Sequence, residues 1–249
     1  MLKKNIYIVG GSGLIGSDLV NQFDDKNNNL IVIDKKIINQ KTKKNIKFIN
    51  LDVSKPKLIE KKLKDVFKKN GNPTSMINCS YPKTLDWKHN DFKRINFETY
   101  SKNISIHLNS YVWITKIFID EMVKNKSQVS SIVLLSSIYG FLGQNPNLYE
   151  DENIKENLTY SVIKGGIINA VRSFSSYYGK YGIRINSVSP GGILDNQDKS
   201  FIKKYSKQVP LNRMAQKKEV SKVIKFLISG DSSYITGQNI IVDGGFSII

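Results

Sequence analysis

Tyr160 and Lys164 are the residues of this chain whose types and spacing most directly indicate chemistry. They stand four residues apart in the stretch LTYSVIKGG (158–166), so a helix there places both side chains on one face. A phenol with a pKa of about 10 is a poor base at neutral pH, but a neighbouring ammonium stabilises the phenolate. The pair could therefore move a proton. The pattern alone is weak, because the chain holds 12 Tyr and 38 Lys and Arg residues.

A glycine-rich turn near the start of the sequence could hold phosphate groups. Gly10, Gly13 and Gly16 form the pattern G-x-x-G-x-x-G between an apolar run at 5–9 and a helical pattern at 14–23. Glycine permits positive φ angles and close approach of the backbone to a pyrophosphate. The helix that follows supplies free N–H groups and the positive end of its dipole. Strand, turn and helix together predict a dinucleotide-binding site.

An acidic residue follows at the position that such a site requires. Asp34 comes directly after the apolar run LIVI (30–33). A carboxylate there accepts hydrogen bonds from the ribose hydroxyls and repels a 2′-phosphate, which favours NAD over NADP. Lys35 and Lys36 beside it could hold that phosphate, so NADP remains the alternative.

Apolar runs alternate with helical patterns along the whole chain and predict the elements that position these residues. Continuous Val- and Ile-rich runs without polar alternation are typical of a parallel sheet covered on both faces. We predict an α/β fold of one domain over residues 1–249: a doubly wound Rossmann fold with a seven-stranded parallel sheet flanked by helices on both faces. Besides 14–23, helices are expected after Ser54 as N-cap and over about 91–124. The expected strands are 5–9, 30–33, 46–49, 75–78, 131–135, 183–188 and 239–242.

Composition argues against several other classes of protein. The single cysteine, Cys79, excludes an internal disulfide and is compatible with the reducing cytoplasm, where we expect the protein. No apolar run approaches the roughly 18–20 residues of a membrane span. The net charge of +17 could indicate nucleic acid, but the lysines are spread along the chain, and arginine, which nucleic-acid sites favour, is scarce. We expect neither nucleic acid nor a membrane as partner, and no metal site.

Taken in order, these and four further segments resemble the short-chain dehydrogenase/reductase family. LSSIYG (135–140) resembles the family's active-site serine segment, with Ser137 as that serine. NCSY (78–81) stands where the family has Asn-Asn-Ala-Gly, and NSVSPGGI (186–193) is similar to its Pro-Gly segment near the nicotinamide. YITGQNIIVDGG (234–245) is similar to its C-terminal signature. The resemblance covers nearly the whole chain.

The resemblance implies an NAD(P)-dependent enzyme that acts on CH–OH groups. Tyr160 would pass a proton to or from the reacting oxygen, and Ser137 would hydrogen-bond that oxygen. Lys164 would stabilise the phenolate and reach the ribose of the nicotinamide. The implied cofactor-binding residues are Gly10, Ser12, Gly13, Leu14, Ile15, Gly16, Asp34, Asp52, Val53, Asn78, Ser80, Tyr160, Lys164, Pro190, Gly191 and Ile193.

Three departures from the family pattern bear on function. The glycine spacing, with Leu14 where the short branch has its middle glycine, is that of the nucleotide-sugar branch, yet the C-terminal signature is the short branch's own. The distance between Ser137 and Tyr160 exceeds the family's usual one, which indicates an insertion at about 141–157. His107 stands where the family has an asparagine that holds a helix kink and a water in the proton path. We therefore consider His107 either a packed histidine or a further catalytic residue that relays protons to solvent.

The combination is most similar to one subgroup, the flagellin-modification dehydrogenases linked to legionaminic (nonulosonic) acid synthesis. The resemblance rests on Tyr81-Pro82, His107-Leu108, the long insertion and SPGGILDNQ (189–197). It implies a sugar-type small molecule as substrate and a role in surface-glycan or nonulosonic acid biosynthesis.

Aromatic and amide side chains suit the apolar face and the hydroxyls of a sugar. Four acidic residues of the insertion could meet an amine, but we expect them in a solvated loop. They are Glu150, Asp151, Glu152 and Glu156. The candidate walls of the substrate pocket are Ser80, Tyr81, Trp87, the insertion and Asp195-Asn196-Gln197.

We expect a hydride transfer between nicotinamide and a hydroxyl or ketone of a sugar or sugar-derived substrate. A nucleotide-sugar epimerase or dehydratase, suggested by the glycine spacing, and a non-catalytic dinucleotide-sensing family member are the alternatives. Family members form homodimers or homotetramers through the helix that carries the tyrosine and through the last strand. Small residues on that helix and an apolar C-terminal segment favour such an oligomer; they are Gly165, Gly166, Ala170, Phe246, Ile248 and Ile249.

Overall fold

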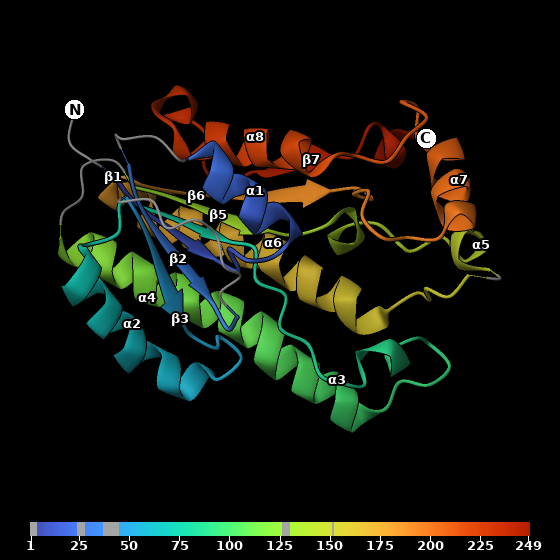
Figure 1. Ribbon diagram of the computed structural model, residues 1–249, viewed down its shortest axis with the longest axis horizontal. Helices are drawn as coiled ribbons and strands as arrows, with labels where there is room; N and C mark the ends of the chain where they lie inside the picture. Colours follow the sequence, from blue (N-terminus) through green and yellow to red (C-terminus); the bar gives the residue numbers. More distant parts are fainter. Residues whose placement is uncertain (1–3, 24–27, 37–44, 126–129, 151) are drawn as a thin grey trace.

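Seven parallel strands form one continuous sheet through the centre of the molecule (Figure 1). The computed structural model describes residues 4–23, 28–36, 45–125, 130–150 and 152–249, so Asp151 of the insertion lies outside the described residues. All seven expected strands are present, which confirms the doubly wound fold. In spatial order they are β3 (Ile46–Asn50), β2 (Asn28–Asp34), β1 (Lys4–Val9), β4 (Ser75–Asn78), β5 (Ser130–Leu135), β6 (Ile183–Pro190) and β7 (Asn239–Val242).

Helices cover both faces of this sheet, and alternate side chains of each strand enter a different core. In β1, Tyr7 and Val9 join a cluster with α2, α4 and α6, while Ile6 and Ile8 join a cluster with α1 and α8. Figure 1 shows α1 and α8 above the sheet and the other three below it. The helices are α1 (Leu14–Gln22), α2 (Pro56–Asn70), α4 (Ser110–Lys124), α6 (Leu158–Tyr178) and α8 (Lys217–Ile228). Burial on both faces explains why the strands read as continuous apolar runs.

The strand order places the functional segments at one edge of the sheet. Strand order reverses direction between β1 and β4, and in such sheets ligands bind beyond the carboxyl ends of the strands at that point. The glycine-rich turn after β1, the segment after β4 and the serine segment after β5 all leave the sheet at this edge. Short 3₁₀ turns lie at Trp87–His89, Ile138–Gly140, Gly179–Tyr181, Gly230–Ser232 and Phe246–Ile248.

The expected start of helix α2 is wrong by one residue. The helix begins at Pro56 with Lys55 as its N-cap, whereas the sequence analysis placed Ser54 in that role. Proline suits a first helical position because its missing N–H would be unpaired there. The N–H of Ser54 instead binds Oδ1 of Asp52 at 2.9 Å, which turns the chain after β3.

The long helix expected over about 91–124 begins only at Phe97 and is not uniform. The carboxylate of Asp91 accepts the N–H groups of Lys93 (3.0 Å) and Arg94 (3.2 Å), which makes a turn instead of a helix. Asn96 caps the helix by accepting the N–H of Thr99 at 2.9 Å. The helical stretch then consists of α3 (Phe97–Asn103), a π-helical segment (Ile104–Asn109) and α4. A π-helical segment inside a helix often marks a functional site, and this one carries His107.

The insertion is a docked element and not the expected solvated loop. Its short helix α5 (Pro146–Tyr149) packs against α7 (Lys199–Lys207), with Leu148 fully buried. Glu152 is only 6 % exposed and lies 3.0 Å from Nζ of Lys204, and Ser200 Oγ donates to it at 2.9 Å. The apolar pair Leu148-Tyr149 explains the difference, because it forms a small third core with side chains of α7.

Two glycines of α6 pack within the chain. A Cβ at Gly165 would lie 3.1 Å from the carbonyl oxygen of Gly140, and one at Gly166 would lie 2.9 Å from a methyl carbon of Leu108. Their small size therefore serves the docking of two neighbouring segments on α6. This corrects the interpretation of both glycines as a subunit-facing surface. None of the helices in the described part of the chain combines the length and hydropathy needed to cross a bilayer.

Candidate active site

Ser137, Tyr160 and Lys164 line one cavity of about 320 Å³ at the carboxyl edge of the sheet. Ser137 follows β5, and the other two lie in the first two turns of α6. The side chain of Asn157 caps α6 by accepting the N–H of Tyr160 at 2.8 Å. The cap fixes the start of the helix, and with it the side chain of Tyr160.

The serine segment is held against α6 by close backbone packing. A Cβ at Gly140 would lie 2.8 Å from the carbonyl carbon of Lys164, so only glycine permits this approach. Ser136 Oγ also donates to the carbonyl oxygen of Lys164 at 2.9 Å. Ser136 thus anchors the segment, and both Ser136 and Ser137 line the cavity.

Burial dominates the electrostatics of the Tyr–Lys pair. Lys164 is 2 % exposed, and burial lowers the pKa of its ammonium to about 7. Its Nζ donates to the carbonyl oxygen of Leu135 at 2.9 Å and lies 5.6 Å from the ring centroid of Tyr160. Burial raises the pKa of Tyr160, and a hydrogen bond with Ser137 opposes that shift. The expected lowering of the Tyr160 pKa by Lys164 is therefore not found in this structure.

His107 lies behind this pair in a buried aromatic environment. It is fully buried, with Tyr81 edge-on at 5.2 Å and Tyr111 at 5.3 Å between ring centroids. Burial, helped by the charge of Lys164, holds the pKa of the imidazole well below its usual range, so the ring is neutral near pH 7. No group in the described part of the chain hydrogen-bonds either ring nitrogen.

A second cavity, of about 370 Å³, continues from the first along the glycine-rich turn. The two share Gly13, Cys79, Ser80 and Tyr81. The expected cofactor residues that line one or both are Gly10, Ser12, Gly13, Leu14, Ile15, Asp34, Asp52, Val53, Ser80, Tyr160, Lys164, Pro190, Gly191 and Ile193.

The glycine-rich turn has the backbone geometry that a pyrophosphate requires. Gly10 has a φ of +80°, and a Cβ there would lie 2.5 Å from the Cα of Ser80. A Cβ at Gly16 would lie 2.2 Å from the carbonyl oxygen of Gly10, so Gly16 lets α1 approach the turn from behind without lining the cavity. Gly13 is the N-cap of α1 and offers no side-chain acceptor to the first N–H groups of the helix. These N–H groups remain available to an anion.

Asp34 closes the far end of the cleft. Its Oδ2 accepts the N–H of Ser12 at 3.0 Å, and its Oδ1 accepts the N–H of Lys36 at 3.3 Å. A carboxylate has about four lone-pair directions, so both oxygens can still accept ribose hydroxyls. Free helical N–H groups at one point and a carboxylate at another fit the phosphates and the ribose of a dinucleotide.

Asn78 supports the site from below and does not line either cavity. Its Oδ1 accepts the N–H (3.1 Å) and the hydroxyl (2.7 Å) of Ser80. Burial raises the pKa of the Cys79 thiol to about 12, so this cysteine is an inert filler of the wall. Several lining residues carry no motif in the sequence and were not expected here; they include Leu51, Lys83, Ile106 and Ser136. Leu51 could have been expected in the same way as Asp34, because it stands just beyond the end of an apolar run, at 46–49.

A third cavity, of about 450 Å³, lies on the other side of Tyr160. Tyr81 borders all three cavities and makes edge contacts with Trp87 and Tyr160, at centroid distances of 5.7 and 6.0 Å. Tyr81, Trp87 and the insertion line the third cavity, as expected for substrate-pocket walls, while Ser80 lines only the first two. Its other lining residues are Lys88, His89, Arg94, Tyr139, Gln144, Tyr149, Asn153, Ile154, Lys155, Glu156 and Asn157.

The segment Asp195–Gln197 is not part of that wall. Oε1 of Gln197 accepts the N–H of Asp195 at 2.8 Å, and its Nε2 donates to the carbonyl oxygen of Ile193 at 2.8 Å. The segment therefore closes on itself. Arg94 lines the cavity instead. It was not expected from the sequence, because its position depends on a loop that contains no recognisable motif.

Comparison with known sequences identifies relatives over the full length. Residues 15–247 match the family model described as enoyl-(acyl carrier protein) reductase. The chain is 28 % identical over 254 residues to post-translational flagellin modification protein A of Campylobacter coli, covering 98 % of each chain. It is 30 % identical over 255 residues to 3-oxoacyl-[acyl-carrier-protein] reductase FabG of Buchnera aphidicola subsp. Baizongia pistaciae, covering 98 % of this chain and 97 % of the relative.

Solved structures show the same fold. A short chain dehydrogenase from Leptospira borgpetersenii with bound NAD+ superposes with a TM-score of 0.89 at 28 % identity, covering 99 % of this chain and 94 % of that one. A 4-hydroxyisoleucine dehydrogenase complexed with NADH superposes with a TM-score of 0.83 at 21 % identity, covering 99 % and 100 %.

Proposed function

Because the chain belongs to the short-chain dehydrogenase/reductase family, we propose that it is an NAD(H)-dependent oxidoreductase of a sugar or sugar-derived hydroxyl or ketone. One observation carries this proposal. Ser137, Tyr160 and Lys164 line a cavity that is continuous with the glycine-rich cleft and has Tyr160 in common with the third cavity. A phenol is thus available to a dinucleotide on one side and to a substrate on the other.

NAD is the proposed cofactor. Asp34 would accept the ribose hydroxyls, and its charge would repel a 2′-phosphate. The bound NAD+ of the Leptospira relative supports this choice. The N–H groups after Gly13 would hold the pyrophosphate, and the wall at Pro190 and Gly191 would adjoin the nicotinamide.

The chain's own residues would manage the proton that accompanies hydride transfer. NAD supplies the acceptor for a hydride when it is bound. Tyr160 takes the proton of the substrate hydroxyl in oxidation and returns it in reduction, while Ser137 holds the same oxygen. Lys164 would hold the ribose and, when it carries a proton, would favour the phenolate together with the positive charge of bound NAD+, against the burial that raises the pKa of Tyr160. His107 extends the path from Lys164, because a neutral imidazole with two free nitrogens can accept a proton on one and donate from the other.

The substrate class is inferred from the third cavity and from one relative. Tyr81 and Trp87 offer ring surface, and Gln144, Asn153 and Asn157 offer amides, which suits a sugar. The similarity to flagellin modification protein A supports a role in surface-glycan or nonulosonic acid biosynthesis. We place the enzyme in the cytoplasm, because its single cysteine is compatible with reducing conditions.

We also propose that the enzyme is a homodimer or homotetramer. Ile248 and Ile249 are 79 % and 81 % exposed at the C-terminus, and Trp113 on α4 is 47 % exposed. Covering such side chains is a common reason for association. Sedimentation at micromolar concentration tests this directly, and a single monomeric species would contradict it.

The catalytic proposal is tested with a substrate panel. Neutral, phosphorylated and acidic sugars, together with an acyl thioester, are offered with NAD+ or NADH while absorbance of the reduced nicotinamide is followed. We expect turnover of a sugar and a loss of about 10²- to 10⁴-fold in kcat for Tyr160→Phe, with NADH binding retained. Turnover of the thioester alone, or equal activity of the variant, would contradict the proposal. Isomerisation without net NADH would indicate an epimerase.

A further inference from the structure

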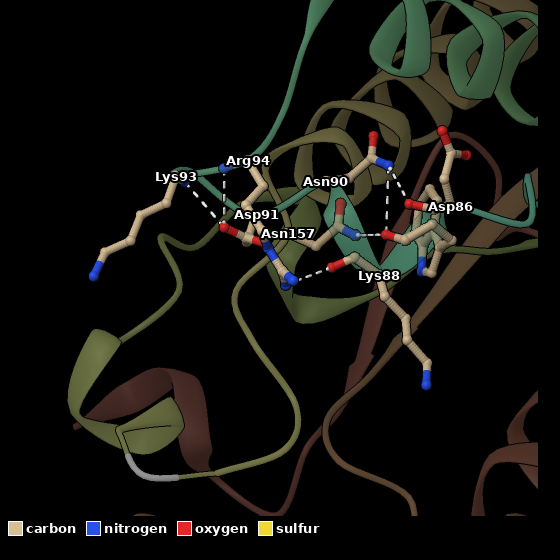
Figure 2. Close-up of polar contacts among 8 residues, drawn as sticks. Asp86, Lys88, Asn90, Asp91, Lys93, Arg94 and Asn157 are labelled. Atoms are coloured by element: carbon tan, nitrogen blue, oxygen red, sulfur yellow. Dashed lines mark hydrogen bonds and ion pairs between the residues drawn. The ribbon is translucent and has the colours of Figure 1, made fainter.

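The loop between β4 and α3 holds one arginine in a fixed position at the third cavity. Nε of Arg94 lies 2.6 Å from Oδ2 of Asp91, and its Nη2 donates to the carbonyl oxygen of Lys88 at 3.0 Å (Figure 2). The side chain of Asp91 is only 10 % exposed and is itself held by two backbone N–H groups. No described residue accepts a hydrogen bond from Nη1. The guanidinium is therefore oriented in advance, with donors left over for a ligand.

A short chain of contacts links this loop to the catalytic helix. Oγ1 of Thr159 donates to Oδ1 of Asn90 at 2.7 Å, and both residues are buried. Asn157, the N-cap of α6, donates its Nδ2 to the carbonyl oxygen of Trp87 at 3.3 Å. Thr159 precedes Tyr160 directly in the sequence. The loop that carries Arg94 is thus tied to the catalytic helix by one buried and one partly buried hydrogen bond.

The charged groups around the third cavity favour an anion. Lys88, Arg94 and Lys155 line it, with His89, whereas Glu156 is the one carboxylate among its described lining residues. Asp91, which neutralises part of the charge of Arg94, does not line the cavity. A bound anion would therefore meet an excess of positive charge, carried by exposed side chains around the cavity that can donate charge-assisted hydrogen bonds.

We propose that the third cavity is built for a substrate that carries an oxyanion, a phosphate or a carboxylate, and that Arg94 binds this group with Lys88 and Lys155. This inference rests on the proposed function, since it assigns the substrate class of the same site. Arg94 fixes the far end of the substrate while Tyr160 acts on the hydroxyl or ketone, so the distance between the two groups selects the substrate.

Kinetics with matched substrates tests the selection. For any sugar that the enzyme turns over, its neutral, phosphorylated and carboxylate forms are compared by kcat/KM. We expect the anionic forms to exceed the neutral form by about tenfold or more, since hydrogen bonds to charged groups contribute most. Arg94→Gln should remove this preference mainly through KM, and Arg94→Lys should keep part of it. A preference for the neutral form, or an unchanged preference in Arg94→Gln, overturns the proposal. The better of the two anions identifies the group.

A binding measurement decides the inference even where no sugar is turned over. Inorganic phosphate is titrated into the NADH-saturated enzyme and followed calorimetrically. We expect wild type to bind phosphate and Arg94→Gln to bind it about tenfold more weakly. Lys93→Gln is the matched control, because it removes one positive charge from the same turn. The Lys93 side chain does not line the cavity and points away from the other residues drawn in Figure 2, so this variant should bind phosphate as tightly as wild type does. Equal affinities of the three proteins, or no binding to wild type, would overturn the proposal. NADH binding without turnover of any sugar would defeat the proposed function alone.

Discussion

The dinucleotide cleft and the third cavity meet at Tyr81, but the chain builds them by different means. The cleft consists of backbone at the carboxyl ends of parallel strands, and its geometry depends on glycines such as Gly10 and Gly16. The third cavity consists of two loops, residues 81–94 and the insertion at 141–157, which are fixed by side-chain contacts. The difference indicates that the cleft proposed for the cofactor is tied to the sheet itself, whereas the cavity proposed for the substrate depends on loops that can change without altering the sheet.

A substitution that weakens the docking of the insertion should have the largest effect on substrate binding while leaving cofactor binding unchanged. Leu148 is fully buried in the small core that docks α5 on α7, and Leu148→Ala should weaken that docking by about 2–5 kcal/mol. We expect faster proteolysis within the insertion and a raised KM for substrate, with an unchanged Kd for NADH.

The matched control is Leu148→Met, which keeps the volume and should cost less than about 1.5 kcal/mol. If Leu148→Ala weakens NADH binding as much as substrate binding, the two regions are not independent.

A substitution in the glycine-rich turn should instead weaken cofactor binding. Gly10→Ala places a side chain at a φ of +80°, which costs about 1–2 kcal/mol before any contact is counted. The new Cβ would also lie 2.5 Å from the backbone of Ser80, so the segment after β4 must move. We expect a lower melting temperature and a raised Kd for NADH, measured by fluorescence.

Gly143→Ala is the control for this change, because a Cβ at Gly143 meets no atom within 4 Å and its φ is not positive. A normal NADH affinity in Gly10→Ala would mean that the turn does not shape the cleft.

The same contrast explains what the sequence could predict. Gly10, Gly13, Asp34, Tyr160 and Lys164 follow from local patterns, because each belongs to a strand end, a turn or one helical turn. Ser137 was expected only from the family resemblance of LSSIYG (135–140). Arg94 could not be found, since its place depends on Asp91 turning the chain where a helix was expected. The insertion was misjudged because the burial of Glu152 depends on Lys204, a partner far along the sequence.

Lys164 lines the cavity that holds Ser137 and Tyr160, and its burial gives its stability contribution a defined pH dependence. Its pKa falls to about 7 in the folded protein, below the ordinary value of 10.5. Between these values the unfolded chain binds more protons than the folded one, so the free energy of unfolding rises with pH across that window. The slope attributable to this group is at most about 1.4 kcal/mol per pH unit.

Denaturant unfolding from pH 7 to 9.5, in wild type and Lys164→Met without cofactor, measures that slope as a difference. Wild type should gain stability relative to the variant as the pH rises. A difference that stays constant over this range would show that the lysine is not desolvated as its burial indicates.

Replacing His107 should have the smallest effect on stability, and it tests whether this residue serves packing or catalysis. A buried imidazole without hydrogen bonds from described residues is a cost to folding, so His107→Leu should stabilise the protein by about 1 kcal/mol. Its pKa is held below the usual 6.5, so wild type binds fewer protons than the unfolded chain and loses stability as the pH falls below that value. The stabilisation by His107→Leu should therefore grow in acid.

If His107 also relays protons, the same variant should turn over substrate more slowly, and His107→Asn, the residue that the family pattern has here, should restore part of the rate. A variant that is more stable and equally active would reduce His107 to a packing residue.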